Sequence, residues 1–304
     1  MNRRNFIGLS AAAVSLGTGR AAEETAEKPL LHFGLITDIQ YADNDPEGER
    51  HFRESIPKLK DAVAWLAKRE LPFTLHLGDL IDRSFSSFDA VLPLLAGLGH
   101  PVHHLLGNHD YTVADAEKAG VVAKMGMSRD YYSFTHSGVK FVMLDTNEVS
   151  TYKHPAETPG DQAGEALLAK LVAEKAPSAK PWNGGISQEQ LTWLDKELAD
   201  ADAAKQPVIV CGHHPLLPED AHVVWNRAEI FTVLDKHPSV RAFFNGHNHA
   251  GAEAVRNGIP YITFKSLLHE PGITAYSAIR LYADRVEIDG NGREKSRVIP
   301  LKTA

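Results

Sequence analysis

The chain has 304 residues, of which 43% are hydrophobic and 23% are charged, and this is the composition of an ordinary globular protein. Its length suffices for one large α/β domain with a sizeable core. The formal net charge of −7 argues against a surface that coats nucleic acid, so we expect no nucleic-acid partner.

The N-terminus has the pattern of an export signal. Arg3 and Arg4 precede a small and apolar stretch over residues 7–19, which is too short to span a bilayer as a helix. We expect residues 1–22 to be a twin-arginine signal peptide, with an ordinary Sec signal as the alternative. The protein would then be periplasmic or otherwise extracytoplasmic and would meet the twin-arginine translocase during export. No Cys directly follows the apolar run, so no stable membrane anchor is expected.

Hydrophobic periodicity predicts alternating strands and helices in the first half of the chain. Strands are predicted at residues 30–37, 73–77 and 102–106, and helices at residues 55–68 and 88–98. Two further strands, at residues 131–136 and 139–145, form a predicted hairpin around Ser137-Gly138.

The second half continues this alternation and ends in strands. A helix is predicted at residues 164–175, and a capping box at residues 187–190 opens a helix through Leu198. A strand at 208–211, a helix at 224–235 and a strand at 240–245 follow, and Asn257-Gly258 is a predicted hairpin turn.

This order of elements predicts an α/β fold in which two mixed sheets pack face to face with helices outside. We expect a single domain over residues 30–304. The polar segment at residues 148–186 and the segment at residues 111–127 are expected to be lids over the site.

Five separated fragments place polar side chains directly after predicted strands. They are Asp38-Ile39-Gln40, Gly78-Asp79, Gly107-Asn108-His109-Asp110, Gly212-His213-His214 and Gly246-His247-Asn248-His249. A strand end followed by a tight turn points the next side chain out of the sheet edge, where α/β sheets keep their sites. Carboxylate, amide and imidazole donors without a thiolate suit two divalent metal ions, the arrangement used for phosphate-ester hydrolysis. Each fragment alone is a weak indication, and their joint occurrence carries the argument.

These fragments resemble the calcineurin-like metallophosphoesterase family. The pattern of that family is Asp-x-His, Gly-Asp-x-x-Asp, Gly-Asn-His-Asp/Glu, a lone His after a strand, and Gly-His-x-His. Gln40 stands where the family usually has His. This departure, together with residues 33–43, 183–194 and 243–249, is similar to the manganese-dependent ADP-ribose/CDP-alcohol diphosphatase branch. The loop after Gln40 is shorter than in animal members of that branch, which puts recognition of the nucleobase in doubt.

The resemblance implies a four-layer αββα sandwich and a binuclear metal centre. Asp79 is the implied bridging carboxylate. One metal would take Asp38, Gln40 and His249, and the other would take Asn108, His213 and His247. An amide oxygen is a harder ligand than imidazole, so Gln40 favours Mn²⁺ or Mg²⁺ over Zn²⁺. We therefore expect two divalent metal ions. Mn is the expected metal, and Fe, Zn and Mg are the alternatives.

His109 is the expected general acid, or a cation over the charge that develops on the leaving oxygen. Asp82 has the spacing in the family pattern that would orient His109. A helix-cap or turn carboxylate is the alternative for Asp82.

Four residues are candidates for substrate contact. His214 follows a ligand, and contact with substrate phosphate and simple packing are both open. Arg53, like Arg50, could meet phosphate, and an exposed surface position is the alternative. Trp182, beside Asn183, could stack on a base from the lid, with a core position as the alternative.

The predicted function is hydrolysis of phosphoanhydride bonds in small nucleoside-diphosphate-linked substrates such as ADP-ribose or a CDP-alcohol. A phosphodiesterase or phosphomonoesterase with a non-nucleotide substrate is the alternative, favoured by the export signal and the short loop. A non-catalytic binding or scaffold protein on the same fold predicts decay of the ligands, yet all seven ligands and His109 are present.

Overall fold

The apolar runs predicted as strands form two mixed sheets in a computed structural model that describes residues 27–302. The predicted signal peptide over residues 1–22 lies outside the described residues. The first sheet has the order β12 (Arg297–Pro300), β11 (Arg285–Gly292), β10 (Ala275–Leu281), β1 (Leu31–Ile36), β2 (Thr74–Leu77) and β3 (Val102–Leu105). The second has the order β4 (Tyr132–His136), β5 (Val139–Met143), β6 (Val208–Cys211), β7 (Val240–Asn245), β9 (Ile259–Thr263) and β8 (Ala252–Arg256).

In the first sheet β1, β2 and β3 are parallel and the other side is antiparallel, whereas the second sheet has a parallel centre and two antiparallel edges. Strand β1 pairs parallel with β2 and antiparallel with β10, and β6 runs parallel to both β5 and β7. The five strands that end in the predicted metal fragments, β1, β2, β3, β6 and β7, all have parallel neighbours. Parallel neighbours finish at the same edge of a sheet, so their fragments emerge together.

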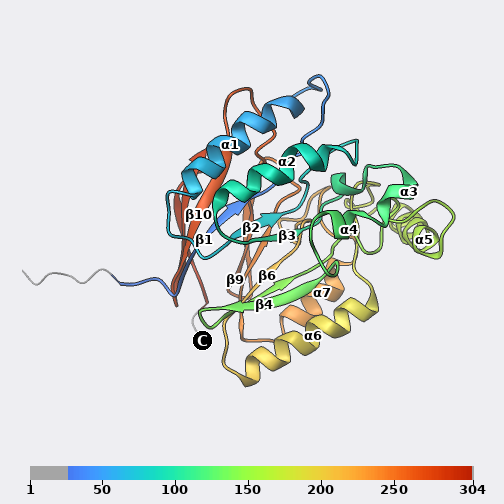
Figure 1. The fold of residues 1–304 in the computed structure, drawn as a ribbon. Helices are drawn as coiled ribbons and strands as arrows, with labels where there is room; N and C mark the ends of the chain where they lie inside the picture. The colour runs from blue at the N-terminus through green and yellow to red at the C-terminus, as the bar shows by residue number, and fades with distance from the viewer. Residues whose placement is uncertain (1–26, 303–304) are drawn as a thin grey trace, which may run out of the picture.

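The two sheets bury their apolar faces against each other. Phe33 and Phe73 of the first sheet each meet Phe141 of the second edge-on, with ring centroids 5.4 Å apart. Helices cover the outer faces (Figure 1) and bury two further apolar clusters against the sheets. This is the predicted four-layer αββα arrangement. The helices are α1 (Ser55–Leu66), α2 (Ser87–Leu95), α3 (Asp115–Lys118), α4 (Val121–Lys124), α5 (Pro159–Ala173), α6 (Gln188–Ala203) and α7 (Arg227–Leu234).

The capping box predicted at the start of α6 is half formed. The Ser187 hydroxyl accepts a hydrogen bond from the Gln190 backbone N–H at 3.1 Å, as predicted. The Gln190 side chain does not return to the Ser187 backbone, because it bonds both the N–H and the carbonyl of Asp145. The backbone N–H of Ser187 donates to Glu148 instead. Glu148, from another segment, therefore takes the place of the Gln190 side chain as the acceptor for this N–H. The prediction of a bond from the Gln190 side chain to the Ser187 backbone was wrong.

The two predicted lids differ in how they are attached. In the segment at residues 111–127, Val121 and Met125 are buried in the apolar cluster beneath α1 and α2. In the segment at residues 148–186, Glu148 accepts hydrogen bonds from both the backbone and the hydroxyl of Ser187. A lid function for either segment stays a prediction.

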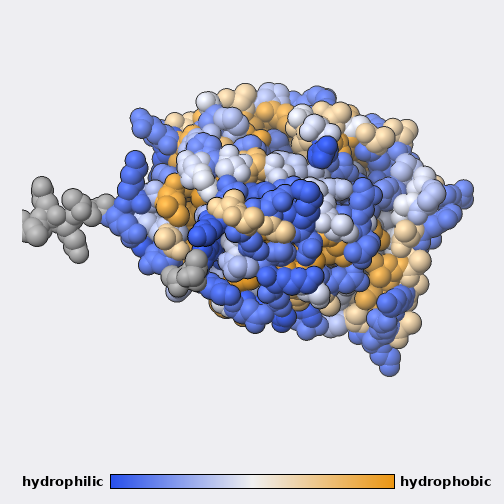
Figure 2. Space-filling view, turned by 90° about the horizontal axis from the view of Figure 1, so that it is seen from below, coloured by the Kyte–Doolittle hydropathy of each residue, from blue (hydrophilic) through white to orange (hydrophobic). Residues whose placement is uncertain are grey.

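The surface seen from below in Figure 2 is mostly hydrophilic, with apolar side chains in small groups. Among residues 27–302, no helix has the length and apolar character needed to cross a membrane.

Candidate metal centre

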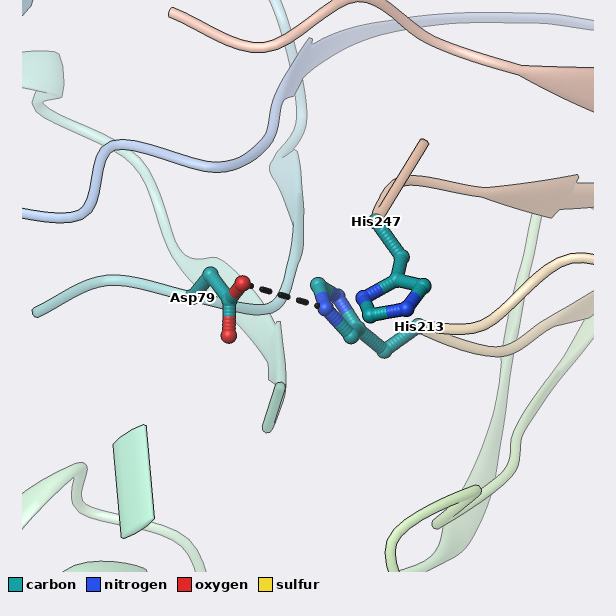
Figure 3. Close-up of side chains that lie close together, drawn as sticks. All are labelled: Asp79, His213 and His247. Carbon is teal, nitrogen blue, oxygen red and sulfur yellow. Dashed lines mark ion pairs between the residues drawn. The ribbon is translucent and has the colours of Figure 1, made fainter. Parts of the chain in front are cut away.

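The five predicted fragments meet at the carboxyl ends of β1, β2, β3, β6 and β7. Donor atoms of Asp79, His213 and His247 lie within 4.8 Å of one another, and so do those of Asp38, Asp79 and His249. Asp79 belongs to both groups, the position expected of a carboxylate that bridges two cations. Figure 3 shows the His213 ring directed at Asp79 with the His247 ring beside it.

Four residues of this site have a left-handed backbone. The φ angles are +52° at Asp38, +45° at Gln40, +58° at Asp79 and +65° at His247. Residues other than Gly adopt such angles at a cost of about 1–3 kcal/mol, and they concentrate at functional sites. Surrounding hydrogen bonds must therefore hold these loops in place.

Asp110 supplies much of that support. Its buried carboxylate accepts hydrogen bonds from the backbone N–H groups of Asp79, Leu80, Ile81 and Gly107, at 2.8–3.2 Å. It thereby joins the turn after β2 to the turn after β3. Asp110 belongs to the Gly107–Asp110 fragment, but the sequence does not predict this role, because a carboxylate that binds backbone across 31 positions leaves no local pattern.

Glycine is required where the loops approach most closely. A Cβ at Gly107 would overlap the Asp79 carboxylate, and one at Gly246 would overlap Thr37 and Asp38. Any larger residue would displace a metal-binding carboxylate.

Two of the histidines are fixed by hydrogen bonds from their outer ring nitrogens. His213 Nδ1 donates to the Leu77 carbonyl at 2.8 Å, which leaves Nε2 facing Asp79 Oδ2 at 3.2 Å. His247 Nε2 lies 3.0 Å from Asn183 Oδ1, which leaves Nδ1 free as a ligand. Such outer partners set the tautomer and ring orientation of a metal ligand.

The donor set fits a pair of divalent cations. Within residues 27–302, Gln40 Oε1, Asn108 Oδ1 and His213 Nε2 are buried without a hydrogen-bond partner. Buried polar atoms are otherwise almost always paired, so unpaired donor atoms on three of the fragments around Asp79 fit a bound cation. Burial disfavours a charged His213, yet the Asp79 and Asp38 carboxylates raise its pKa to about 9. This excess of negative charge is what cations would neutralise.

His109 faces the same site from the turn after β3. Its Nδ1 lies 3.1 Å from Asp82 Oδ1, and its backbone N–H donates to Asp79 Oδ1 at 2.8 Å. Burial opposes a charge on the ring, but the Asp79 and Asp82 carboxylates outweigh burial and raise the pKa of His109. Thr112 donates to the same Asp82 oxygen at 3.0 Å, so Asp82 is held in the orienting position.

A cavity of about 650 Å³ opens over these residues. Its walls combine imidazole, aromatic and amide groups with one arginine. They are formed by Arg50, Asn108, His109, Thr112, Tyr152, Pro181, Trp182, His222, His247, Asn248, His249, Ala250 and His269.

Three of the four expected substrate contacts do not line this cavity. His214 is fully buried, with Nδ1 2.7 Å from Thr146 Oγ1 and Nε2 3.2 Å from the Trp182 carbonyl, so its position is that of packing. Arg53 pairs at the surface with Asp43 and Asp45, outside the cavity.

Asn183 is also fully buried, where it orients His247 and donates to two backbone carbonyls. Trp182 does line the cavity, and 42% of it is exposed. The cavity is also lined by Tyr152, His222 and His269, which the sequence does not predict as site residues because they fall outside the motifs.

Comparison with known proteins agrees with this geometry. Residues 31–251 match the model of the calcineurin-like phosphoesterases. The chain belongs to the calcineurin-like phosphoesterase family. It is accordingly a metal-dependent hydrolase of phosphoric esters or anhydrides.

Similar proteins in this family extend over nearly the whole chain. The manganese-dependent ADP-ribose/CDP-alcohol diphosphatase of Oryza sativa is 30% identical over 91% of this chain and 96% of its own length. The protein of that name from Arabidopsis thaliana is 31% identical over 89% of this chain and 97% of its own. A solved dimetal phosphatase from Danio rerio has a TM-score of 0.82 at 26% identity, covering 90% of this chain and 100% of that one.

Proposed function

We propose that this phosphoesterase hydrolyses the phosphoanhydride bond of small nucleoside-diphosphate-linked molecules of the ADP-ribose or CDP-alcohol type, with Mn²⁺ at both metal positions. The observation that carries the proposal is Gln40 in the metal centre. Its amide nitrogen, Nε2, lies 2.8 Å from Asp79 Oδ2 and 2.9 Å from His249 Nε2, so the amide is within reach of both, and rotation of the amide plane would present Oε1 to a cation there. The names and the coverage of the similar proteins support the same substrate class.

The residues that would hold the cations are those that converge on Asp79. They are Asp38, Gln40 and His249 on one side, and Asn108, His213 and His247 on the other, with Asp79 shared. When bound, two such cations activate water and neutralise charge on the phosphoryl oxygens. An amide oxygen from Gln40 favours Mn²⁺ or Mg²⁺ at its position over Zn²⁺.

His109 is placed to give a proton to the leaving oxygen. Water attacks one phosphorus and releases a proton to solvent, the P–O–P bond breaks, and the departing phosphate oxygen takes the proton that His109 holds. A proton from solvent then restores His109. Asp82 keeps the imidazole oriented through the 3.1 Å contact with Nδ1, so that Nε2 carries the transferred proton.

The cavity suits a nucleotide conjugate in size and lining. Its volume of about 650 Å³ falls within the usual range for small-molecule sites, roughly 300–1,000 Å³. Trp182 and Tyr152 offer aromatic surface for a base, and Arg50 offers a charge for the second phosphate.

A substrate panel tests the proposal. The purified chain, supplied with Mn²⁺, should release AMP from ADP-ribose and CMP from CDP-choline faster than it cleaves bis-nitrophenyl phosphate or nitrophenyl phosphate. Asp79→Ala supplies the inactive control, because it removes the shared carboxylate. A preference for the monoester or for a diester without a nucleoside would reject the proposal and favour the alternative of a non-nucleotide substrate.

One structural feature favours that alternative. The short loop after Gln40 is tied down by Arg53, which pairs with Asp43 and Asp45 at 2.5 Å, so it brings no aromatic side chain to the cavity. The scaffold alternative has no such support, because donors from four of the five fragments lie together.

Export by the twin-arginine route to the periplasm is also part of the proposal. Arg3 and Arg4 ahead of the apolar stretch at residues 7–19 support it. That route carries folded proteins, which suits an enzyme that takes up its metal ions before export.

A further inference from the structure

The third histidine of the metal centre is held differently from the other two. The outer ring nitrogens of His213 and His247 bond to oxygen atoms of Leu77 and Asn183. His249 Nδ1 instead lies 2.5 Å from Nε2 of another histidine, His269. That residue belongs to none of the five fragments.

The contacts fix the proton positions in this pair. His249 Nε2 faces the metal centre, 3.4 Å from Asp38 Oδ1, and a ligand nitrogen carries no proton. The His249 proton is therefore on Nδ1 and is donated to His269 Nε2. His269 then carries its own proton on Nδ1, which lies 3.2 Å from Glu49 Oε2. The rings meet edge to face, at 81°, with centroids 4.6 Å apart.

The backbone of His269 is anchored to the metal loop. The buried Lys58 ammonium donates to the carbonyls of Leu268 and His269, both at 2.9 Å. The Leu268 N–H donates to the Asp38 carbonyl at 3.1 Å. His269 is thus fixed relative to the strand end that carries Asp38, while its partner Glu49 is 85% exposed.

We propose that His269 is a positioning residue, which holds His249 in the tautomer and ring orientation that bind the cation on the Asp38 side, with Glu49 fixing the tautomer of His269. The inference rests on His249 as a metal ligand and not on the identity of the substrate. The two metal positions then differ in how their histidine ligands are held. His249 depends, through His269, on the exposed Glu49 carboxylate, whereas His213 and His247 are held by the buried Leu77 and Asn183.

Titration of the chelated full chain with Mn²⁺ alone, followed by calorimetry and by electron paramagnetic resonance of free Mn²⁺, tests this assignment. His269→Ala should weaken one of the two Mn²⁺ affinities roughly 10–100-fold and leave the other unchanged, as loss of an outer partner does. His269→Gln should restore most of the affinity, since its Oε1 can accept the His249 proton. Glu49→Ala, which removes the acceptor of the His269 Nδ1 proton, should weaken the same position by a smaller factor. His51→Ala is the matched control, because its ring contacts Glu54 and lies outside the cavity.

Two Mn²⁺ affinities equal to those of the unaltered chain in His269→Ala would overturn the inference. So would a raised KM with both affinities intact, which would make His269 a substrate contact, or a His269→Gln variant as weak as His269→Ala. If His269→Ala does not fold, Glu49→Ala at the exposed position decides, and unchanged binding in that variant would reject the inference. Binding of two Mn²⁺ is measured without substrate, so failure of the ADP-ribose proposal would leave this result intact.

Discussion

His109 is joined to Asp79 through its own backbone: the His109 N–H donates to Asp79 Oδ1 at 2.8 Å, while its ring lies 3.1 Å from Asp82. The expected acid and the expected bridging carboxylate therefore form one hydrogen-bonded unit. A shift of the turn after β3 would move both, which places proton donation and metal binding under the same structural control.

His109→Ala should keep both metal ions, since this side chain supplies no ligand, and should lose roughly 10²–10⁴ in kcat. The loss should be smaller for a nitrophenyl phosphodiester, whose leaving oxygen needs little protonation, and larger for an alcohol diester. Asp79→Ala, in contrast, should lose metal and activity with every leaving group. Steady-state rates across leaving groups, together with metal analysis, check this. Equal losses for all leaving groups with metal retained would mean that His109 acts by charge or positioning.

Gln40 should set the metal preference. Protein stripped by a chelator should be inactive and should recover with Mn²⁺ better than with Zn²⁺, because an amide oxygen is the harder ligand. Gln40→His introduces the residue that is usual in the wider family. Because imidazole is the softer ligand, this variant should recover with Zn²⁺ as well as with Mn²⁺, or better. Activity measured after reconstitution with each ion is the test. Equal recovery of the unaltered chain with both ions would remove the argument from ligand hardness.

Acid should destabilise the fold through the neighbouring histidines of β2 and β3. Burial lowers the pKa of His104 to about 4 and that of His76 well below its usual value of 6.5. The unfolded chain takes up these protons near pH 6.5 and the folded chain does not, so the free energy of unfolding falls as the pH drops from about 6.5 towards 4.

For His104 the fall between pH 7 and pH 5 amounts to about 2 kcal/mol. His104→Leu should reduce the total fall by about that amount, measured by urea unfolding in the presence of a chelator at both pH values. An identical fall in the variant and the unaltered chain would show that His104 is protonated in the folded state.

Replacement of both Arg3 and Arg4 by Lys should hold the precursor in the cytoplasm, because the twin-arginine receptor distinguishes guanidinium groups from ammonium groups. Fractionation of cells that express the two forms, with blotting of the periplasmic fraction, measures this. Unchanged arrival in the periplasm would assign the export to the Sec route.

The sequence by itself determined which strands carry the metal ligands. Each fragment follows a short apolar run, and Gly marks the turns at which backbone and carboxylate approach, as at Gly107 and Gly246. These are local properties, and they sufficed to predict both sheets, the order of most elements and the convergence of Asp38, Asp79 and His213.

Tertiary structure decided which residues support those ligands. Asn183 and His269 orient His247 and His249 across 64 and 20 positions of the chain, and Asp110 crosses 31 to hold the turn at Asp79. Tertiary packing also buries His214 and leaves Arg53 at the surface, so neither lines the cavity. Hydrogen bonds between distant segments depend on how sheets and loops pack. Hydrophobic periodicity reports only which residues share a face of one element, so it does not predict these bonds.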